Sequence, residues 1–362
     1  MDENSIESLL NEIIDSNNEI DEENLNSELE KVISEKATEA LRFIKENAIT
    51  TLAYETSEKI GFEERNYALW KEPLDLLELF LITTKNIGNE FNQKHRPDAA
   101  KNNDFVFEAL TRLHGRACQV GFEILTLLKA GYADGANARW RTLYEISAFS
   151  YYIKNNGNEM AEKYLLYHHI ESYRSISDYL KHPELYKKHK EFLGDELLSQ
   201  EEMEEIKKRK ENLCSPSRFG EKFSNNYGWA GPKINNFRDL ETEVGIDHIR
   251  PYYKMANISI HAGPKGIRFS LGSLDKNIIP AGPSNMGLAD PGSNTAISLH
   301  NINTALLTTK LNIENLIFLK AMNSLVNEIN EALFRCHKYT WNEYERRKKE
   351  METSEDDNQL SD

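Results

Sequence analysis

Two apolar segments, residues 105–130 and 134–153, are joined by a turn of only a few residues, and this arrangement constrains the fold most. Apolar residues recur every three or four positions in the first segment, at Leu110, Leu113, Ala117, Val120, Ile124, Leu127 and Leu128. This spacing is typical of one face of an α-helix. Gly131 readily adopts the left-handed conformation that ends a helix, and Asp134 is a suitable cap for the next one. Because the connection is so short, we predict an antiparallel helical hairpin at the centre of the fold.

Charged residues interrupt the second helix of this hairpin, whose end, residues 146–153, is apolar on almost every side and is therefore predicted to be buried. Arg141 and Glu145 share a stripe with apolar residues, and a charge isolated in such surroundings is too costly to leave unpaired. We therefore predict that both are buried or nearly so and paired with opposite charge. In an antiparallel hairpin Glu123 lies at a height similar to that of Arg141, so we expect these two to meet.

This charged cluster has two interpretations. As a functional site it is a charged cleft lined by Arg116, Glu123, Arg139, Arg141 and Glu145. As a structural feature it is an ion-pair network that fixes the register of the hairpin. Glu123 also shares a stripe with Arg112, Arg116 and Gln119 that would simply face water.

The rest of the chain predicts an all-α fold, a mainly helical bundle. Apolar spacing and helix-ending residues predict helices at about 25–48, 74–81, 159–180, 200–212, 237–260 and 293–336. Residues 262–293 contain six of the eighteen glycines and four of the ten prolines. Within them, 267–271 and 277–279 predict a small β-hairpin or lid, and the alternative is an irregular Gly/Pro-rich insertion.

Charge and pattern divide the chain into four segments: an acidic helical arm (1–36), an N-terminal helical segment (37–104), a main helical domain (105–336) and a charged C-terminal tail (337–362). The formal charge of −15 belongs to the ends. Residues 1–36 hold twelve acidic residues against two lysines (−10), and residues 351–362 hold five acidic residues (−5), which leaves 37–350 neutral. A protein that coats nucleic acid would carry a basic excess, so that class is excluded, although a local basic groove is not.

Other classes are excluded by what the sequence lacks. No uncharged apolar run approaches the roughly 20 residues of a membrane span, and no signal peptide precedes the acidic start. We therefore expect a cytoplasmic protein that does not enter a membrane. The three cysteines match neither a disulfide framework nor a zinc pattern, and the histidines have no partners at ligand spacing. No glycine spacing suits a nucleotide, so neither a metal nor a cofactor is predicted.

A polar stripe near residue 260 is the second candidate site. Arg250, Lys254, Asn257 and His261 are spaced at i, i+4, i+7 and i+11 of the predicted helix. A histidine at a helix C-terminus is favoured when protonated and can act as a general acid or base near neutral pH. The alternative is that His261 only binds nearby carbonyl groups.

Three sequence motifs carry a resemblance to a known family. Residues 131–145, the run Tyr227-Gly228-Trp229-Ala230, and residues 253–261 with their Ser-x-His ending resemble the core of the bacterial domain-of-unknown-function family 5677. The resemblance covers roughly 105–310. It implies one mainly helical domain and does not identify a reaction. Four of the candidate site residues belong to the shared pattern: Arg139, Arg141, Glu145 and His261.

A looser similarity connects the chain to HEPN ribonucleases. Their site is an arginine, usually followed by a polar residue such as asparagine, then three residues and a histidine. Asn257 and His261 match, whereas Ala256 occupies the arginine position. The similarity implies RNA cleavage, in a toxin or antiviral effector, only if Arg139 or Arg141 supplies the cation.

The sequence supports two hypotheses. In the first, the protein is a defence or toxin effector that cleaves or binds RNA without metal, with His261 as acid and base, Arg139 or Arg141 on the phosphate, and Glu145 orienting the arginine. The substrate would be bound by Arg116, Glu123, Arg250, Lys254 and Asn257.

In the second hypothesis the protein is a non-enzymatic interaction or scaffold protein. Its acidic arm and its long C-terminal helix would dock a partner protein or a second copy. We also expect a homodimer, because Leu319, Met322 and Phe334 fall outside the narrowest apolar stripe of the 293–336 helix and are predicted to stay uncovered.

Overall fold

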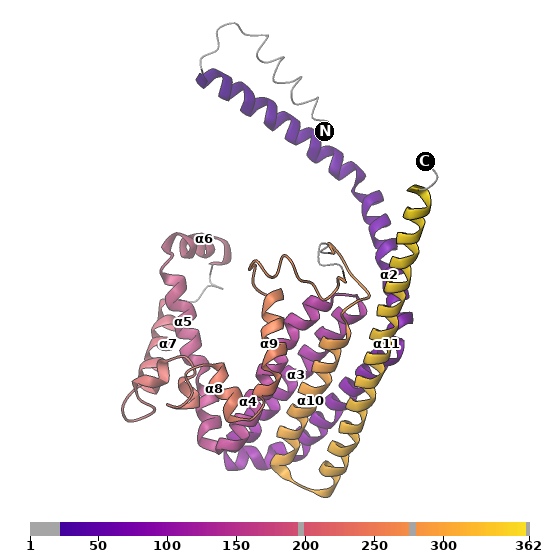
Figure 1. The fold of residues 1–362 in the computed structure, drawn as a ribbon. Coiled ribbons are helices and arrows are strands. Elements are labelled where there is room, and N and C mark those ends of the chain that lie inside the picture. Colours follow the sequence, from indigo (N-terminus) through magenta and orange to yellow (C-terminus); the bar gives the residue numbers. More distant parts are fainter. Residues whose placement is uncertain (1–21, 195–198, 275–279, 360–362) are drawn as a thin grey trace. The chain divides into compact units, whose positions relative to one another are not determined.

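The computed structural model describes residues 22–194, 199–274 and 280–359, and over these residues it contains helices and no strand. The prediction of an all-α fold is confirmed. The α-helices, labelled in Figure 1, are α2 (Glu22–Asn102), α3 (Phe105–Lys129), α4 (Ala133–Leu166), α5 (His168–Leu180), α6 (Pro183–Leu193), α7 (Gln200–Leu213), α8 (Phe237–Glu243), α9 (Arg250–Ala256), α10 (Ala289–Leu307) and α11 (Ile313–Gln359).

The chain forms two compact units, residues 1–64 and 65–362. In the described part of the first unit, residues 22–64 are helical, and the helix predicted at 25–48 is confirmed. Many of its large apolar side chains are exposed, among them Phe43, Ile44 and Ile49. Nowhere in the described chain is a helix both long and apolar enough to cross a membrane.

In the second unit, α2 is kinked at Trp70, which has φ −102° and ψ 15°. Pro73 explains the kink, because it has no N–H to donate to the carbonyl of Leu69 and its ring crowds that group. The Leu69 carbonyl accepts a hydrogen bond from the thiol of Cys336 instead, at 3.6 Å. The helix expected after Pro73 is present, as one part of this longer α2.

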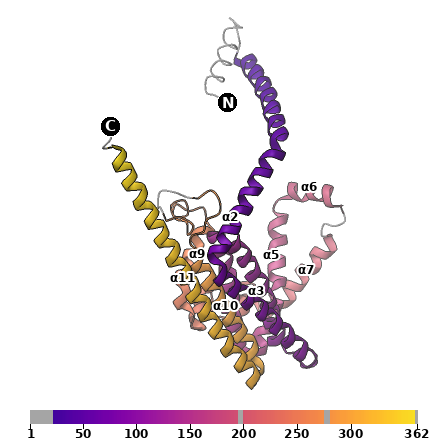
Figure 2. The ribbon, with the colours of Figure 1, turned by 90° about the vertical axis from the view of Figure 1, so that its right-hand side faces the viewer.

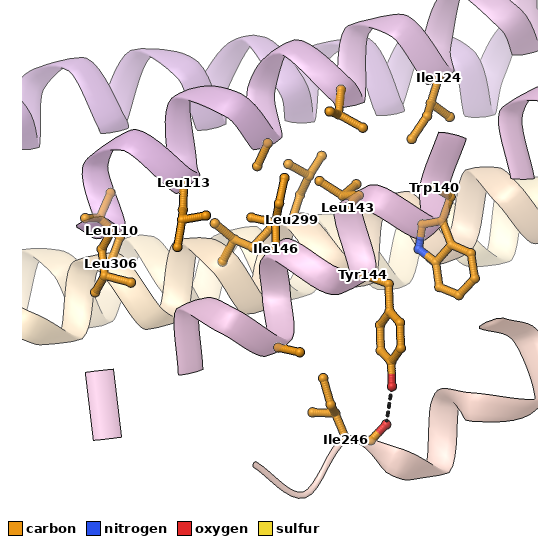
Figure 3. Close-up of a cluster of buried hydrophobic side chains, with 14 of the residues drawn as sticks. Leu110, Leu113, Ile124, Trp140, Leu143, Tyr144, Ile146, Ile246, Leu299 and Leu306 are labelled. Carbon is orange, nitrogen blue, oxygen red and sulfur yellow. Dashed lines mark hydrogen bonds between the residues drawn. The ribbon is translucent and has the colours of Figure 1, made fainter. Parts of the chain in front are cut away.

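The predicted antiparallel hairpin is present as α3 and α4, and it forms the centre of the second unit. Helix α10 packs against both of its helices and α11 packs against α10, as both ribbon views show (Figures 1 and 2). Trp140 and Tyr144 of α4 lie in the buried cluster with their rings stacked at 5.5 Å (Figure 3). Their polar atoms are satisfied: the Trp140 indole donates to the Asn294 carbonyl at 3.0 Å, and the Tyr144 hydroxyl donates to the Ile246 carbonyl at 2.9 Å.

The turn of the hairpin differs from the prediction in one respect. Gly131 has the expected positive φ of 79°. Asp134, however, is not the N-cap of α4; it lies in the first turn of the helix and holds the Gly/Pro-rich segment. Its carboxylate accepts hydrogen bonds from the Ser259 hydroxyl at 3.1 Å, the Ser270 hydroxyl at 2.6 Å and the Leu271 amide at 3.1 Å.

Four predicted elements have different boundaries in the structure. The helix expected at 159–180 is divided between the end of α4 and α5. The helix expected at 237–260 is divided into α8, α9 and short 3₁₀ turns. The helix expected at 293–336 is interrupted between α10 and α11, where the side chain of Asn312 accepts from the Asn315 amide at 2.7 Å and so caps α11. Residues 267–271 form turns rather than a strand, and 277–279 lie outside the described residues. The irregular insertion is therefore confirmed, and the first strand of the β-hairpin is not formed.

The arm formed by α5, α6 and α7 lies beside the bundle and is attached through α4 and α5 (Figure 2). Its first helix, α5, begins two residues after α4 ends. This arrangement gives α3, α4 and α5 a common concave side.

Candidate functional site

A cleft of about 920 Å³ lies on this concave side. Helices α3, α4 and α5 and the loop at residues 226–229 each contribute to its lining. The residues that matter for its chemistry are Glu108, Arg112, Arg116, Glu145, Phe149, Tyr164, His168, Arg174, Tyr227 and Trp229. Its size falls within the range of about 300–1,000 Å³ that is typical of ligand sites.

One wall of the cleft is aromatic. The Trp229 ring is buried and packs edge-on against Phe149 at 5.4 Å and Tyr164 at 4.8 Å. Tyr227 approaches Phe149 at 6.4 Å and remains partly exposed. Burial raises the pKa of the Tyr227 hydroxyl to about 12, and the Glu145 carboxylate acts in the same direction, so Tyr227 is a neutral donor at physiological pH.

The backbone that carries this wall is unusual. Tyr227 has a φ of 58°, in the left-handed region that a bulky residue seldom occupies. The next residue must be glycine, because a Cβ on Gly228 would lie 2.3 Å from the carbonyl oxygen of Phe223. Strained residues that persist in a fold are found disproportionately at ligand sites, which makes Tyr227 a functional candidate.

The charges of the cleft are unequally satisfied. Glu108 pairs with both Arg96 and Arg112, at 2.9 Å and 2.5 Å. Arg116 bonds only the neutral amide of Gln119, at 2.7 Å, and Arg174 donates to the carbonyl of Ser224. Within the described residues no ion pair joins these two guanidinium groups to a carboxylate, so both can bind a ligand, although the lining as a whole holds three arginines and three glutamates, Glu171 among them.

His168 is the histidine that lines the cleft. Its Nδ1–H donates to the carbonyl of Leu165 at 2.7 Å. Because a carbonyl can only accept, Nδ1 carries a proton, and in the neutral form of the ring the lone pair lies on Nε2. The ring also lies 3.9 Å from that of His169.

Glu145 connects the cleft to the predicted charged cluster. It pairs with Arg141 at 3.4 Å and accepts a hydrogen bond from Tyr253 of α9 at 2.7 Å. The Arg141 guanidinium also lies 4.7 Å from the centre of the Tyr253 ring. Arg141 and Glu145 are paired as expected, but the prediction that both are buried or nearly so is wrong, because their side chains remain 29% and 33% exposed. The expected contact between Glu123 and Arg141 is wrong: Glu123 pairs with Arg139, whose position along α4 matches it better.

The four residues of the second predicted stripe, Arg250, Lys254, Asn257 and His261, have different surroundings in the structure. Arg250 pairs with Glu241, which is fully buried. Burial raises the pKa of Glu241 against the lowering effect of Arg250. Lys254 is exposed, and the Oδ1 atom of Asn257 is buried without a partner among the described residues.

His261 follows the last 3₁₀ turn of this region and is exposed. No hydrogen bond or ion pair joins its side chain to Arg139, Arg141 or any other described residue, and it does not line the cleft. The catalytic roles assigned to His261, Arg139, Arg141 and Glu145 remain predictions.

A Cys-His-Asn arrangement is also present, but it lies in the core. The His114 Nε2–H donates to Asn303 at 2.9 Å, and Cys118 lies 3.8 Å from Nδ1 of the same ring. All three residues are buried, and burial raises the pKa of the Cys118 thiol to about 12. A nucleophilic cysteine needs the thiolate form, so this arrangement is structural. In the described segments no three metal-ligating side chains come together.

Comparison with models of protein families matches residues 107–278 to a family of unknown function, DUF5677. The matched segment, slightly less than half of the chain, is similar to this family. Every residue that lines the cleft lies inside the DUF5677 segment. No curated protein and no solved structure matches the chain.

Sequence reasoning missed His168, Arg174 and the conformation of Tyr227. The doublet His168-His169 has no partner at ligand spacing in the sequence. The residues that line the cleft together with His168 come from distant parts of the chain, residues 108–116 and 226–229. The signal that was available is the Tyr227-Gly228-Trp229 run within the DUF5677 resemblance. An aromatic residue before an obligatory glycine marks a constrained turn.

Proposed function

We propose that this protein is an effector that binds single-stranded RNA in the cleft between α3, α4 and α5. The observation that carries the proposal is the placement of two cations without carboxylate partners, Arg116 and Arg174, beside the partly exposed rings of Phe149 and Tyr227. Arginines bind the phosphate backbone, and aromatic rings stack on unpaired bases irrespective of sequence.

The aromatic wall favours a single strand over a duplex. Paired bases are stacked on one another and cannot reach a side-chain ring, whereas the bases of a single strand can be splayed out onto it. Each stacked base contributes about 1–3 kcal/mol to binding. The segment 37–350 has a net formal charge of zero, which suits a local binding site better than nonspecific coating of a duplex.

Cleavage of the bound RNA would need a base for the 2′-hydroxyl and a cation on the phosphate. In the neutral form of the His168 ring the lone pair lies on Nε2, and the cleft that this histidine lines also contains Arg116. We therefore add His168 to His261 as a second candidate base for metal-independent cleavage. The biological setting that we propose for such an activity is a toxin or antiviral effector.

The binding test uses a labelled single-stranded RNA of about ten nucleotides and fluorescence anisotropy at several salt concentrations. Arg116→Ala should weaken binding about tenfold and lower the slope of log K against log salt by about one. Arg209→Ala is the matched control, because Arg209 is an exposed arginine of α7 outside the cleft, paired with Glu205. Absence of binding by the wild type, or equal affinities of the two variants, would contradict the proposal.

The cleavage test compares growth and total RNA integrity in a bacterial host that expresses wild type, His168→Ala or His261→Ala. Growth arrest and RNA fragments in the wild type, lost in only one variant, would identify the base. Intact RNA in all three, with and without phage challenge, would leave RNA binding without cleavage as the activity.

The alternative of a non-enzymatic interaction protein is favoured by a different observation. In the first unit, Phe43, Ile44 and Ile49 expose large apolar surfaces on an acidic helix. Such surfaces usually mark a docking site. If RNA binds in the cleft, replacing Ile44 by lysine should leave the affinity for RNA unchanged. If the wild type binds no RNA, the apolar surface of this helix is the favoured binding site for a partner protein.

A further inference from the structure

Glu145 of α4 lines the RNA cleft and is held in one orientation there. Its Oε1 atom accepts a hydrogen bond from the Tyr253 hydroxyl at 2.7 Å and lies 3.4 Å from Nε of Arg141. The Arg141 guanidinium in turn lies over the Tyr253 ring, 4.7 Å from its centre. Because both neighbours bind Oε1, the Oε2 atom has no hydrogen bond or ion pair with a described residue, and it keeps accessible surface on a side chain that is 33% exposed.

Aromatic surface lies beside this carboxylate. Phe149 follows Glu145 by four residues, so the two side chains share one face of α4, and both line the cleft. Tyr227 packs edge-on against Phe149 at 6.4 Å. The Glu145 carboxylate lies close enough to Tyr227 to raise the pKa of its hydroxyl, after the larger effect of burial. A base that stacks on these rings can therefore present its edge to Oε2 of Glu145.

The carboxylate of Glu145 is an unexpected group in a cleft for RNA, because it repels phosphates. It is explained if it contacts a base instead of the backbone. An ionised carboxylate only accepts hydrogen bonds, so it pairs best with adjacent donors. Guanine presents two, N1–H and N2–H, on its Watson–Crick edge. Adenine and cytosine place an acceptor nitrogen beside their amino group, and uracil flanks its N3–H with two carbonyl oxygens.

We propose that the cleft prefers guanine, with the base stacked beside Phe149 and Tyr227 and its N1–H and N2–H groups donating to the Glu145 carboxylate. This inference rests on the proposed function, because it assigns a base preference to the RNA site. Glu145 selects the base, whereas the arginines of the cleft bind phosphates irrespective of sequence. Tyr253 is a positioning residue, since its hydroxyl holds Oε1 and leaves Oε2 for the base.

The test measures fluorescence anisotropy of oligouridine strands of about ten nucleotides that carry a different base at one central position. Guanine at that position should strengthen binding by the wild type about tenfold over uracil, as expected of a good two-bond contact to a base. Inosine lacks the N2 amino group, so its strand should bind with intermediate affinity. Strands with adenine or cytosine should bind no more tightly than the inosine strand.

Variants of the full chain identify the group that reads the base. Glu145→Gln replaces an acceptor by an amide donor, so the preference for guanine over uracil should fall below about threefold. Glu159→Gln is the matched control and should keep the full preference, because Glu159 is an exposed glutamate of the same helix that does not line the cleft. Tyr253→Phe removes the hydrogen bond that orients Glu145 and should also lower the preference.

The preference is a ratio of two affinities, so a smaller folded fraction does not change it. If Glu145→Gln does not fold, Tyr253→Phe and the inosine strand decide the same point. Failure of the wild type to bind any of these RNAs would contradict both this inference and the proposed function. Equal affinities for the guanine, inosine and uracil strands would overturn the guanine preference alone and leave RNA binding in place. A full preference in Glu145→Gln would overturn the assignment to Glu145.

Discussion

At the scale of single residues, Glu145 matters most, because it stabilises two neighbours and also lines the cleft. Its carboxylate accepts from the Tyr253 hydroxyl and pairs with Arg141. Tyr253 is buried, so its hydroxyl needs an acceptor, and burial also raises the pKa of this hydroxyl and keeps it a donor. The ion pair itself contributes little, since about a third of each side chain is exposed to water.

We predict that Glu145→Ala lowers the free energy of unfolding by about 1–3 kcal/mol, the effect of leaving a buried donor unpaired. Tyr253→Phe removes the donor, so the double variant should be less destabilised than the sum of the two single variants. Urea unfolding of all four proteins measures this coupling. Strictly additive effects would show that the hydrogen bond does not stabilise the fold.

At the scale of elements, the sequence predicts those parts whose signals are local. Apolar spacing and Gly131 predict the α3–α4 hairpin, because a short turn leaves no other arrangement. The interruption at Asn312 is also local, because its side chain accepts from the Asn315 amide three residues on, but apolar periodicity alone does not register such a cap. The hydrogen bonds of Asp134, by contrast, depend on groups that become neighbours only in the fold. The cleft was missed for the same reason, since its lining comes from four separate elements.

The approach of α2 to α3 gives a test of such a long-range contact. Gly88 lies against His114, and a Cβ at position 88 would lie 2.2 Å from Cε1 of the ring. The ring cannot move freely, because it is buried and hydrogen-bonded to Asn303. Gly88→Ala should therefore destabilise the protein by about 1–3 kcal/mol in urea unfolding.

Gly115 of α3 provides the matched control, because a Cβ there has no atom within 4 Å. Gly115→Ala should stabilise the protein by about 0.5–1 kcal/mol through helix propensity. Equal effects of the two substitutions would mean that α2 and α3 do not pack closely at His114.

At the scale of the whole molecule, the apolar surface of α11 bears on association. The single stripe expected over 293–336 is divided, because α11 starts afresh at Ile313. Of the three residues expected to stay uncovered, Leu319 and Met322 are buried and Phe334 is exposed. The uncovered surface at the start of α11 consists instead of Leu311, Ile313, Leu316 and Ile317, which are 48–76% exposed.

A contiguous apolar patch of this kind usually marks a subunit contact, and two-fold pairs are the commonest assembly. We predict a homodimer, with a mass by light scattering of twice 41.8 kDa. Replacing Ile313 and Ile317 together by glutamate should give the mass of one chain, because buried carboxylates would face each other across the axis. Tyr339→Glu alters an exposed residue elsewhere on α11 and should leave the dimer intact. A wild-type mass of 41.8 kDa that does not change when the protein is concentrated about tenfold would show that this patch is tolerated in water and is not a subunit contact.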